Sequence, residues 1–237
     1  MLMEANPGAA PGAMIPAMPR IRLGRQAPDR KAALAQYRRR AGFYDLELAL
    51  FEPLRRRAIA LLDLRPGAVV LDVGCGTGLS LGLLSQAVGA SGRIVGIEQS
   101  PEMIERARQR VAQHPLPGVT LLNSPVESAA IPVKADAALF HFTHDILRQP
   151  AALANVLHHL RPGARVVASG LKWASPLLWP VNLLVLPAAL HSVTSTEGLA
   201  EPWDRLSPHL DGFEVESAYF GGTYLASGLR KPVLRRR

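Results

Sequence analysis

The sequence predicts an α/β fold, in which buried parallel strands alternate with helices, and three observations support this prediction. The run V-L-D-V at 70–73 is apolar apart from one acid, as in a buried strand, and three glycines follow it at alternate positions. Apolar residues then recur at helical spacing through 79–88, and this segment ends at Gly89. A second strand-like run, R-I-V-G-I-E, occupies 93–98. Strand, turn, helix and strand in this order form the repeating unit of parallel sheets.

The glycine turn and the acid that ends the second strand together predict a site for an adenosine-containing ligand. Gly74, Gly76 and Gly78 remove every Cβ from one side of the turn, so a ligand can lie against backbone N–H groups. A dinucleotide-binding turn reads G-x-G-x-x-G, and Leu79 stands where its third glycine belongs. Glu98 ends the second strand, where a carboxylate can accept both ribose hydroxyls of an adenosine cofactor.

The order D-x-G-C-G-T-G at 72–78 resembles the first motif of class I S-adenosylmethionine-dependent methyltransferases, and R-P-G-x-R-V-V at 161–167 resembles their fifth strand. The resemblance covers roughly 65–230. It implies a Rossmann-like, seven-stranded, mostly parallel sheet with an antiparallel last strand and helices on both faces. It also implies S-adenosyl-L-methionine as the cofactor, bound by the motif residues and those after the second strand: Asp72, Gly74, Cys75, Gly76, Gly78, Glu98, Gln99 and Met103.

The end of the third strand, at 119–122, departs from the family pattern. Family members commonly place an acid there for the adenine amino group, followed by a backbone N–H for a ring nitrogen. Here Ser124 stands at the place of the acid, and Pro125 has no N–H to donate. Either Glu127 or the backbone of Val126 then takes over the adenine contact, or the register shifts.

The fourth strand, at 135–140, leads into H-F-T-H-D, which should lie at the carboxyl edge of the sheet where ligands bind. His141, His144 and Asp145 are therefore the candidate catalytic residues, as a general base or as groups that orient an acceptor. Two alternatives stay open. The histidines and the acid could bind a metal, although no further ligands are evident, or His144 or Asp145 could cap the next helix.

The domain organisation follows from composition along the chain. Residues 1–30 are rich in Pro, Gly and Ala and predict a disordered extension without the unbroken apolar core of a secretory signal, so we expect a cytoplasmic protein. Residues 31–64 predict two helices that form a lid. The methyltransferase domain would occupy 65–231, with an apolar cover at 171–206, and a basic tail follows at 232–237.

The lid and the cover supply further candidate site residues. Tyr44 lies in a segment that resembles the entry segment of small-molecule methyltransferases, and it either closes over the cofactor or packs between helices. The cover is too interrupted by prolines to be a plain membrane-spanning helix. We expect Trp173, Trp179 and Asn182 to line the acceptor pocket, together with His141. The alternatives are a helix packed on the sheet and a peripheral membrane contact.

Near the C-terminus the pattern predicts a short helix at 203–210. Strands at 213–219 and 223–228 follow, paired as a hairpin across the two glycines at 221 and 222. This hairpin is the antiparallel ending that the resemblance implies.

The chain of 237 residues has a net charge of +8 and three arginine triplets, at 38–40, 55–57 and 235–237. These triplets form either a solvated basic surface or a surface that attracts phosphates or anionic lipid. Cys75 is the only cysteine, which excludes an intramolecular disulfide.

The functional expectation is methyl transfer from S-adenosyl-L-methionine to a small hydrophobic or aromatic acceptor, quinone-like or lipid-like. Two alternatives remain. One is an RNA-directed methyltransferase, although H-F-T-H replaces the N-P-P-Y or D-P-P-Y of base-methylating enzymes. The other is a non-catalytic protein that binds S-adenosylmethionine.

Overall fold

A computed structural model describes residues 49–192 and 196–232 of the chain. The predicted extension at 1–30, the lid up to residue 48 with Tyr44, and the tail from 233 onward lie outside the described residues.

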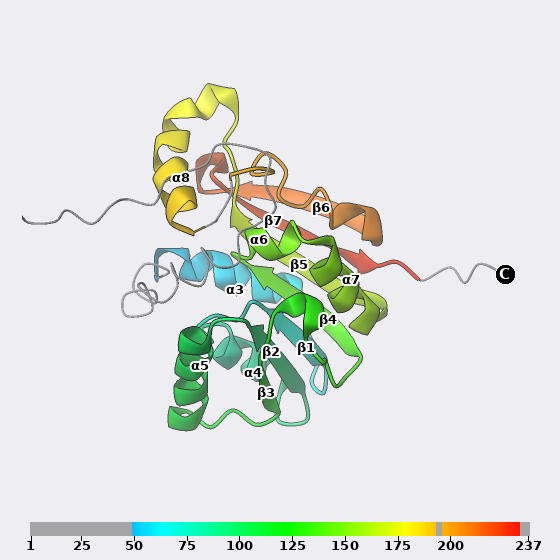
Figure 1. Ribbon diagram of the computed structural model, residues 1–237. Coiled ribbons are helices and arrows are strands. Elements are labelled where there is room, and N and C mark those ends of the chain that lie inside the picture. The colour runs from blue at the N-terminus through cyan, green and yellow to red at the C-terminus, as the bar shows by residue number, and fades with distance from the viewer. Residues whose placement is uncertain (1–48, 193–195, 233–237) are drawn as a thin grey trace, which may run out of the picture.

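Seven strands form one sheet in the order β3-β2-β1-β4-β5-β7-β6 (Figure 1). The five strands β1 to β5 pair in parallel, whereas β7 runs antiparallel to both β5 and β6. The predicted mostly parallel sheet with an antiparallel ending is therefore confirmed. The strand bounds are β1 Val69–Val73, β2 Arg93–Glu98, β3 Val119–Asn123, β4 Ala135–His141, β5 Leu160–Leu171, β6 Leu210–Ala218 and β7 Thr223–Arg230.

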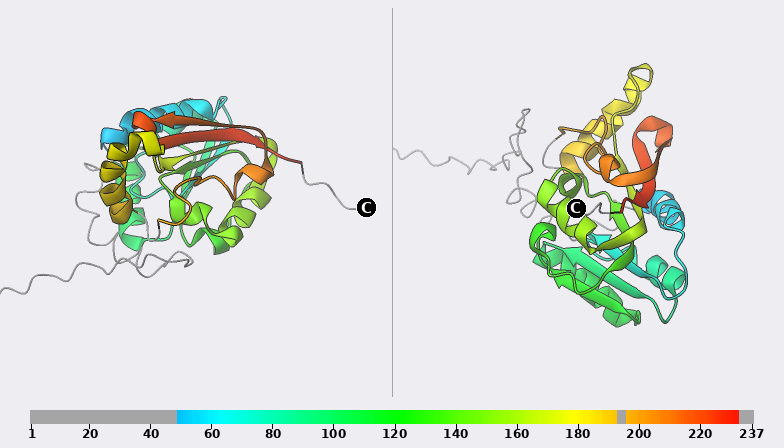
Figure 2. Two further views of the ribbon diagram at one scale, coloured as in Figure 1. Left: turned by 90° about the horizontal axis from the view of Figure 1, so that it is seen from above. Right: turned by 90° about the vertical axis from the view of Figure 1, so that its right-hand side faces the viewer.

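Helices cover both faces of the sheet, as predicted. The helices α3 Glu52–Leu61, α4 Leu81–Val88 and α5 Pro101–Gln113 pack on one face, and α6 His144–Leu147 and α7 Pro150–His159 on the other (Figure 2). In β1, Val70 joins the core of the first face and Leu71 the core of the second, so both are fully buried. This two-sided burial explains why β1 reads as a continuous apolar run instead of an alternation.

The helix starts and stops follow the local sequence signals. Ser100 caps α5, and its side chain accepts a hydrogen bond from the Met103 N–H at 3.3 Å. Gly89, with φ of 67°, ends α4. Short 3₁₀ turns complete the described elements: η1 Ala49–Phe51, η2 Val126–Ser128, η3 Pro176–Leu178, η4 Ser207–His209 and η5 Tyr219–Gly221.

One local prediction was wrong, and a second was confirmed with a longer turn than predicted. The segment 203–210 is not a helix: turns lead into η4, because Pro208 lacks the N–H that a continuing helix needs. The hairpin of β6 and β7 exists, but it does not reverse at the glycine pair alone. Ala218 pairs with Thr223, so residues 219–222 make the turn, with Tyr219 and Phe220 at positive φ.

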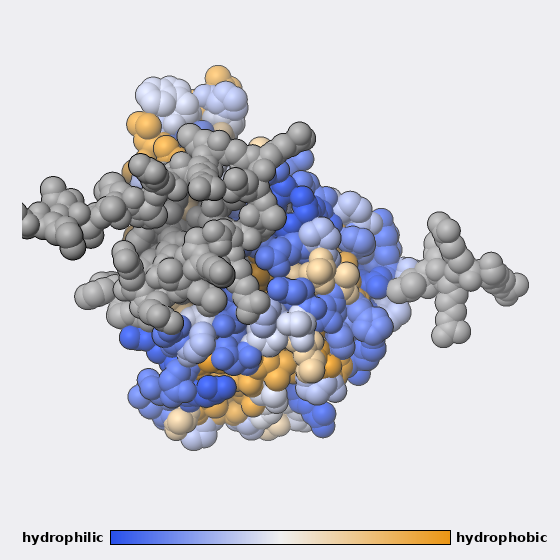
Figure 3. All heavy atoms as spheres, viewed as in Figure 1, coloured by the Kyte–Doolittle hydropathy of each residue, from blue (hydrophilic) through white to orange (hydrophobic). Residues whose placement is uncertain are grey.

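The apolar cover contains one irregular helix, α8 Trp179–Ser192, with Pro187 inside it. This helix projects beyond the sheet in Figure 1 and in the right-hand view of Figure 2. None of the helices in the described ranges is long and apolar enough to cross a membrane. Figure 3 shows hydrophobic residues, in orange, at the top of the molecule where α8 projects. The large apolar side chains that face solvent on η3 and α8 are Leu177, Leu178, Trp179, Leu183, Leu184 and Leu186.

Candidate active site

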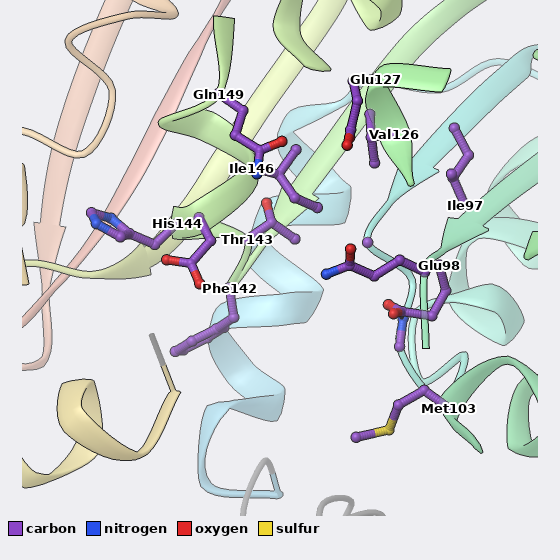
Figure 4. Close-up of a pocket in the computed structure, with 14 residues that line it drawn as sticks. Ile97, Glu98, Met103, Val126, Glu127, Phe142, Thr143, His144, Ile146 and Gln149 are labelled. Atoms are coloured by element: carbon purple, nitrogen blue, oxygen red, sulfur yellow. The ribbon is translucent and has the colours of Figure 1, made fainter. Parts of the chain in front are cut away.

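The candidate site is a cleft at the carboxyl edge of the sheet, between β1 and β4. The chain runs outward from β1 through β2 to β3 and then crosses back to β4, so this position is the switch point where open α/β sheets bind ligands. The cleft encloses about 740 Å³ of empty space, part of it open to solvent. Its lining, shown in Figure 4, comprises Gly74, Gly76, Ile97, Glu98, Gln99, Met103, Val126, Glu127, Phe142, Thr143, His144, Asp145, Ile146 and Gln149.

A second, smaller cavity adjoins the cleft at the glycine turn. Its empty volume is about 310 Å³, and it shares Gly74 and Gly76 with the cleft. Its lining mixes charged and polar residues with glycines and small or apolar ones: Arg55, Asp72, Gly74, Cys75, Gly76, Thr77, Leu79, Ser80 and His141. The two cavities therefore meet at the glycine turn, which lines both of them.

The glycine turn is fixed in a shape that only glycine adopts easily. Gly74, Gly76 and Gly78 have φ of 72°, 56° and 81°. The N–H groups of Gly74 and Cys75 both donate to the carbonyl oxygen of Ile97, at 2.8 and 3.0 Å, which holds the turn against β2.

Glu98 braces the turn from the neighbouring strand. Its carboxylate is buried and accepts hydrogen bonds from the Ser100 N–H at 2.7 Å and the Gly76 N–H at 3.2 Å. Burial raises the pKa of Glu98, and these N–H donors oppose the rise. The backbone of Gln99 also hydrogen-bonds this carboxylate. Because an ionised carboxylate offers about four acceptor positions, Glu98 keeps acceptor capacity for a ligand hydroxyl.

Asp72 is a buried acid with an acceptor left open. Its Oδ2 atom has no hydrogen-bond partner in the part of the chain that the structure describes. Burial raises its pKa to about 7; Arg55 lowers it and Glu98 raises it further. A cationic group in the small cavity would stabilise the ionised form of Asp72.

The structure brings most of the predicted site residues together. Asp72, Cys75 and His141 line the small cavity, and most of the others line the cleft: Gly74, Gly76, Glu98, Gln99, Met103, Val126, Glu127, His144 and Asp145. Gly78 and Ser124 line neither cavity. A Cβ at Gly78 would lie 3.1 Å from that of Ala107, so this glycine lets the turn pack on α5. The Ser124 hydroxyl donates to the Pro125 carbonyl instead.

The predicted acceptor residues of the cover line neither of the two cavities. Trp179 is 61% exposed on α8, and Asn182 is engaged with the backbone N–H and carbonyl of Ala174. Trp173 packs against a small apolar cluster that includes Leu199. In the described part of the cover, only α8 projects outward (Figure 1), whereas other residues of the cover, such as Leu199 and Leu206, are buried.

His144 is buried and His141 is half-buried, and both are neutral at pH 7. His141 Nδ1 lies 2.7 Å from the Ser169 hydroxyl, and burial, with Arg55, lowers its pKa to about 3. His144 Nε2 donates to the Glu197 carbonyl at 2.9 Å, and its pKa falls to about 4, chiefly through burial. In Figure 4 the His144 ring points away from Glu98. Both imidazoles are therefore weak bases. The hydrogen bond of His144 connects the backbone at Glu197 to the cleft wall.

Sequence reasoning missed several lining residues: Arg55, Phe142, Thr143, Ile146 and Gln149. Phe142 has φ of 58°, a conformation rare for a bulky residue and typical of functional sites. Its N–H donates to the Ser169 carbonyl at 2.7 Å, and its ring centroid lies 4.8 Å from that of Phe51. No local pattern signals this backbone; only its position directly after the fourth strand could have marked it.

The residues present fit an adenosyl amino acid of the kind that the sequence predicts. Glu98 keeps acceptor capacity for hydroxyls, and Asp72 Oδ2, Arg55 Nε and Nη2, and His141 Nε2 are buried without partners in the described chain. These unpartnered atoms belong to residues that line the small cavity, where a charged amino-acid end would satisfy them. Within the two described ranges, no group of three or more His, Cys, Asp or Glu could hold a metal ion.

We expect affinity for S-adenosylhomocysteine to rise from pH 6 to 7 and to level off above. We expect a ligand ammonium to bind only ionised Asp72, whose pKa of about 7 leaves it mostly protonated at pH 6. Since this folded-state pKa is raised, the native state binds more protons than the unfolded chain between about pH 4 and 7, and the ligand-free fold loses stability as pH rises there.

Calorimetry in buffers of different ionisation enthalpy checks this prediction, because binding at pH 6 should release a proton. Asp72→Asn should flatten the profile. A wild-type affinity that does not change between pH 6 and 8 would contradict the role of Asp72.

Comparison with protein families matches residues 70–163 to the family described as methyltransferase domain. The chain is 33% identical to nocamycin O-methyltransferase of Saccharothrix syringae over 141 residues, 56% of this chain and 48% of that one. It is 29% identical to aklanonic acid methyltransferase DauC of Streptomyces sp. (strain C5), over 68% of this chain and 73% of that one. It is also 29% identical to 2-phytyl-1,4-naphtoquinone methyltransferase of Thermosynechococcus vestitus, over 76% of this chain and 82% of that one. The chain spans about half the length of the first of these relatives.

Among solved structures, the N-methyltransferase NodS from Bradyrhizobium japonicum WM9 in complex with S-adenosyl-L-homocysteine matches with a TM-score of 0.61. The match covers 84% of this chain and 98% of that one at 19% identity. At this identity the likeness concerns the fold.

Proposed function

Since the chain carries the domain of class I S-adenosylmethionine-dependent methyltransferases, we propose that it transfers a methyl group from S-adenosyl-L-methionine to a small hydrophobic or aromatic acceptor. The observation that carries the proposal is the two-part site around the glycine turn, with Glu98 on one side and Asp72 on the other.

When bound, the cofactor supplies an electrophilic methyl group on its sulfonium. The protein's own contribution is binding and orientation. Gly74 and Gly76 present bare backbone to the cofactor, Glu98 accepts from the ribose hydroxyls, and Asp72 pairs with the ammonium group. Holding the acceptor close and in line supplies most of the acceleration, because proximity replaces a bimolecular encounter.

On the acceptor side, Asp145 and His144 line the cleft and are the candidates for orienting the nucleophile. The low pKa of His144 makes it a weak base at neutral pH. Proton removal is needed only when the acceptor must lose a proton, so an acceptor already ionised at neutral pH suits this site best.

Two observations support a hydrophobic acceptor. Beside His144 and Asp145, the cleft wall includes the apolar side chains of Phe142 and Ile146 (Figure 4). One relative is named for a phytylated naphthoquinone and another for aklanonic acid. The solvent-facing apolar side chains of η3 and α8 also favour contact with a lipid surface, a contact that co-sedimentation with anionic vesicles would test.

The test is incubation with methyl-labelled S-adenosylmethionine and an extract of the source organism, separated into organic-soluble, aqueous and RNA fractions. We expect label in a small molecule of the organic-soluble fraction. Label in RNA would replace the proposal with the RNA-directed alternative. Cofactor binding without label in any fraction would indicate a non-catalytic binding protein.

A further inference from the structure

Arg55 is the first residue of the arginine triplet at 55–57, and its side chain points into the protein. The sequence places Arg55, Arg56 and Arg57 together on what composition alone presents as a basic surface. On α3, however, the side chain of Arg55 is only 2% exposed, whereas those of Arg56 and Arg57 are 62% and 54% exposed. A solvated surface therefore accounts for two of the three arginines and leaves Arg55 to be explained.

The guanidinium of Arg55 has unused donors. Its Nη1 pairs with Glu52 at the start of the same helix, while Nε and Nη2 have no partner among the residues that the structure describes. Arg55 lines the small cavity together with Asp72 and His141. A buried cation with unsatisfied N–H groups is costly unless an anion completes its shell.

The groups facing this cavity define what would satisfy it. Asp72 offers a buried acceptor for a cation, and Arg55 offers donors for an anion. A ligand end that carries both charges, an α-amino acid, matches this pair. A guanidinium also matches a carboxylate geometrically, because its planar fork can donate two parallel hydrogen bonds.

We propose that Arg55 binds the α-carboxylate of the cofactor's amino-acid end while Asp72 accepts its α-ammonium group, so that the small cavity selects ligands with an intact amino acid. This inference rests on the cofactor of the proposed function. It assigns to α3, a helix outside the glycine motif, a direct part in cofactor recognition.

The experiment pairs two ligands with three proteins and measures binding by calorimetry, so it needs no turnover. The ligands are S-adenosylhomocysteine and its decarboxylated analogue, which keeps the adenosine and the ammonium group. The proteins are the wild type, Arg55→Met, and Arg56→Met as the matched control. Arg56 is the next residue on the same helix and pairs with the same Glu52, at 3.0 Å, but faces solvent.

The wild type should bind S-adenosylhomocysteine about 10- to 100-fold more tightly than the analogue, the range for hydrogen bonds to a charged group. Arg55→Met should lose that preference and bind the two ligands with equal affinity. Arg56→Met should keep it. Arg55→Lys keeps the positive charge but not the planar guanidinium, so this variant should keep part of the preference for S-adenosylhomocysteine.

Equal affinities of the wild type for the two ligands would overturn the inference, and this comparison needs no variant to fold. A uniform loss for both ligands in Arg55→Met would also overturn it, because a structural role has that result. If the wild type binds neither ligand, the cofactor assignment of the proposed function itself fails.

Discussion

Gly74→Ala should weaken S-adenosylhomocysteine binding by at least about 100-fold, or about 2.7 kcal/mol. A Cβ at this position would lie 2.6 Å from Thr143 Cγ2 and 2.8 Å from Ile146 Cδ1, and the backbone has φ of 72°. The left-handed conformation costs an alanine about 1–2 kcal/mol, and overpacking adds about 1–3 kcal/mol. The added methyl group would also displace two residues of the cleft wall. Calorimetry gives the affinity, and thermal unfolding gives the loss of stability.

The matched control for Gly74→Ala is Gly82→Ala. Gly82 lies within α4, and a Cβ there would meet nothing within 4 Å. Alanine should stabilise this helix by about 0.5–1 kcal/mol without changing ligand affinity. Wild-type affinity in Gly74→Ala would show that the turn does not carry the ligand.

Glu98→Ala should weaken S-adenosylhomocysteine binding by at least about tenfold, or about 1.4 kcal/mol. The substitution removes the acceptor for the ribose hydroxyls. It also leaves the buried Ser100 N–H and the Gly76 N–H without their acceptor, and each such loss costs about 1–3 kcal/mol of stability. The same calorimetric and thermal measurements therefore have to be read together.

Glu98→Gln separates these two effects, because the amide keeps one oxygen as an acceptor for the braced turn. Glu105→Gln is the control for charge alone, since Glu105 lies on α5 with its side chain 55% exposed. Unchanged affinity in both Glu98 variants would refute the ribose role.

The fold and the part of the candidate site formed by the glycine turn and Glu98 were predictable, because their sequence signals are local. Gly74 and Gly76 were recognisable because they lie in a turn that needs glycine, and Glu98 because it is an acid at the end of a strand. The sheet edge then brings them together, since parallel strands end on the same side. Ser100 was likewise predictable as a helix cap, because a serine followed by a proline is a common helix start.

The remaining parts depend on long-range packing that no local pattern encodes. Arg55 looks like its two neighbours in the sequence, and only the docking of α3 on the sheet decides which of the three faces inward. The sequence around Phe142 contains no signal that predicts its left-handed backbone conformation. Trp179 and Asn182 were assigned to the pocket because the cover is apolar, yet the helix that carries Trp179 leaves that side chain exposed.

The most direct test of the site is a crystal structure of the protein with S-adenosylhomocysteine. We predict the ribose hydroxyls at Glu98, the ammonium group at Asp72 and the carboxylate at Arg55, with the ligand lying across the glycine turn. Density for the ligand elsewhere on the protein, with this cleft filled by protein side chains, would contradict the site.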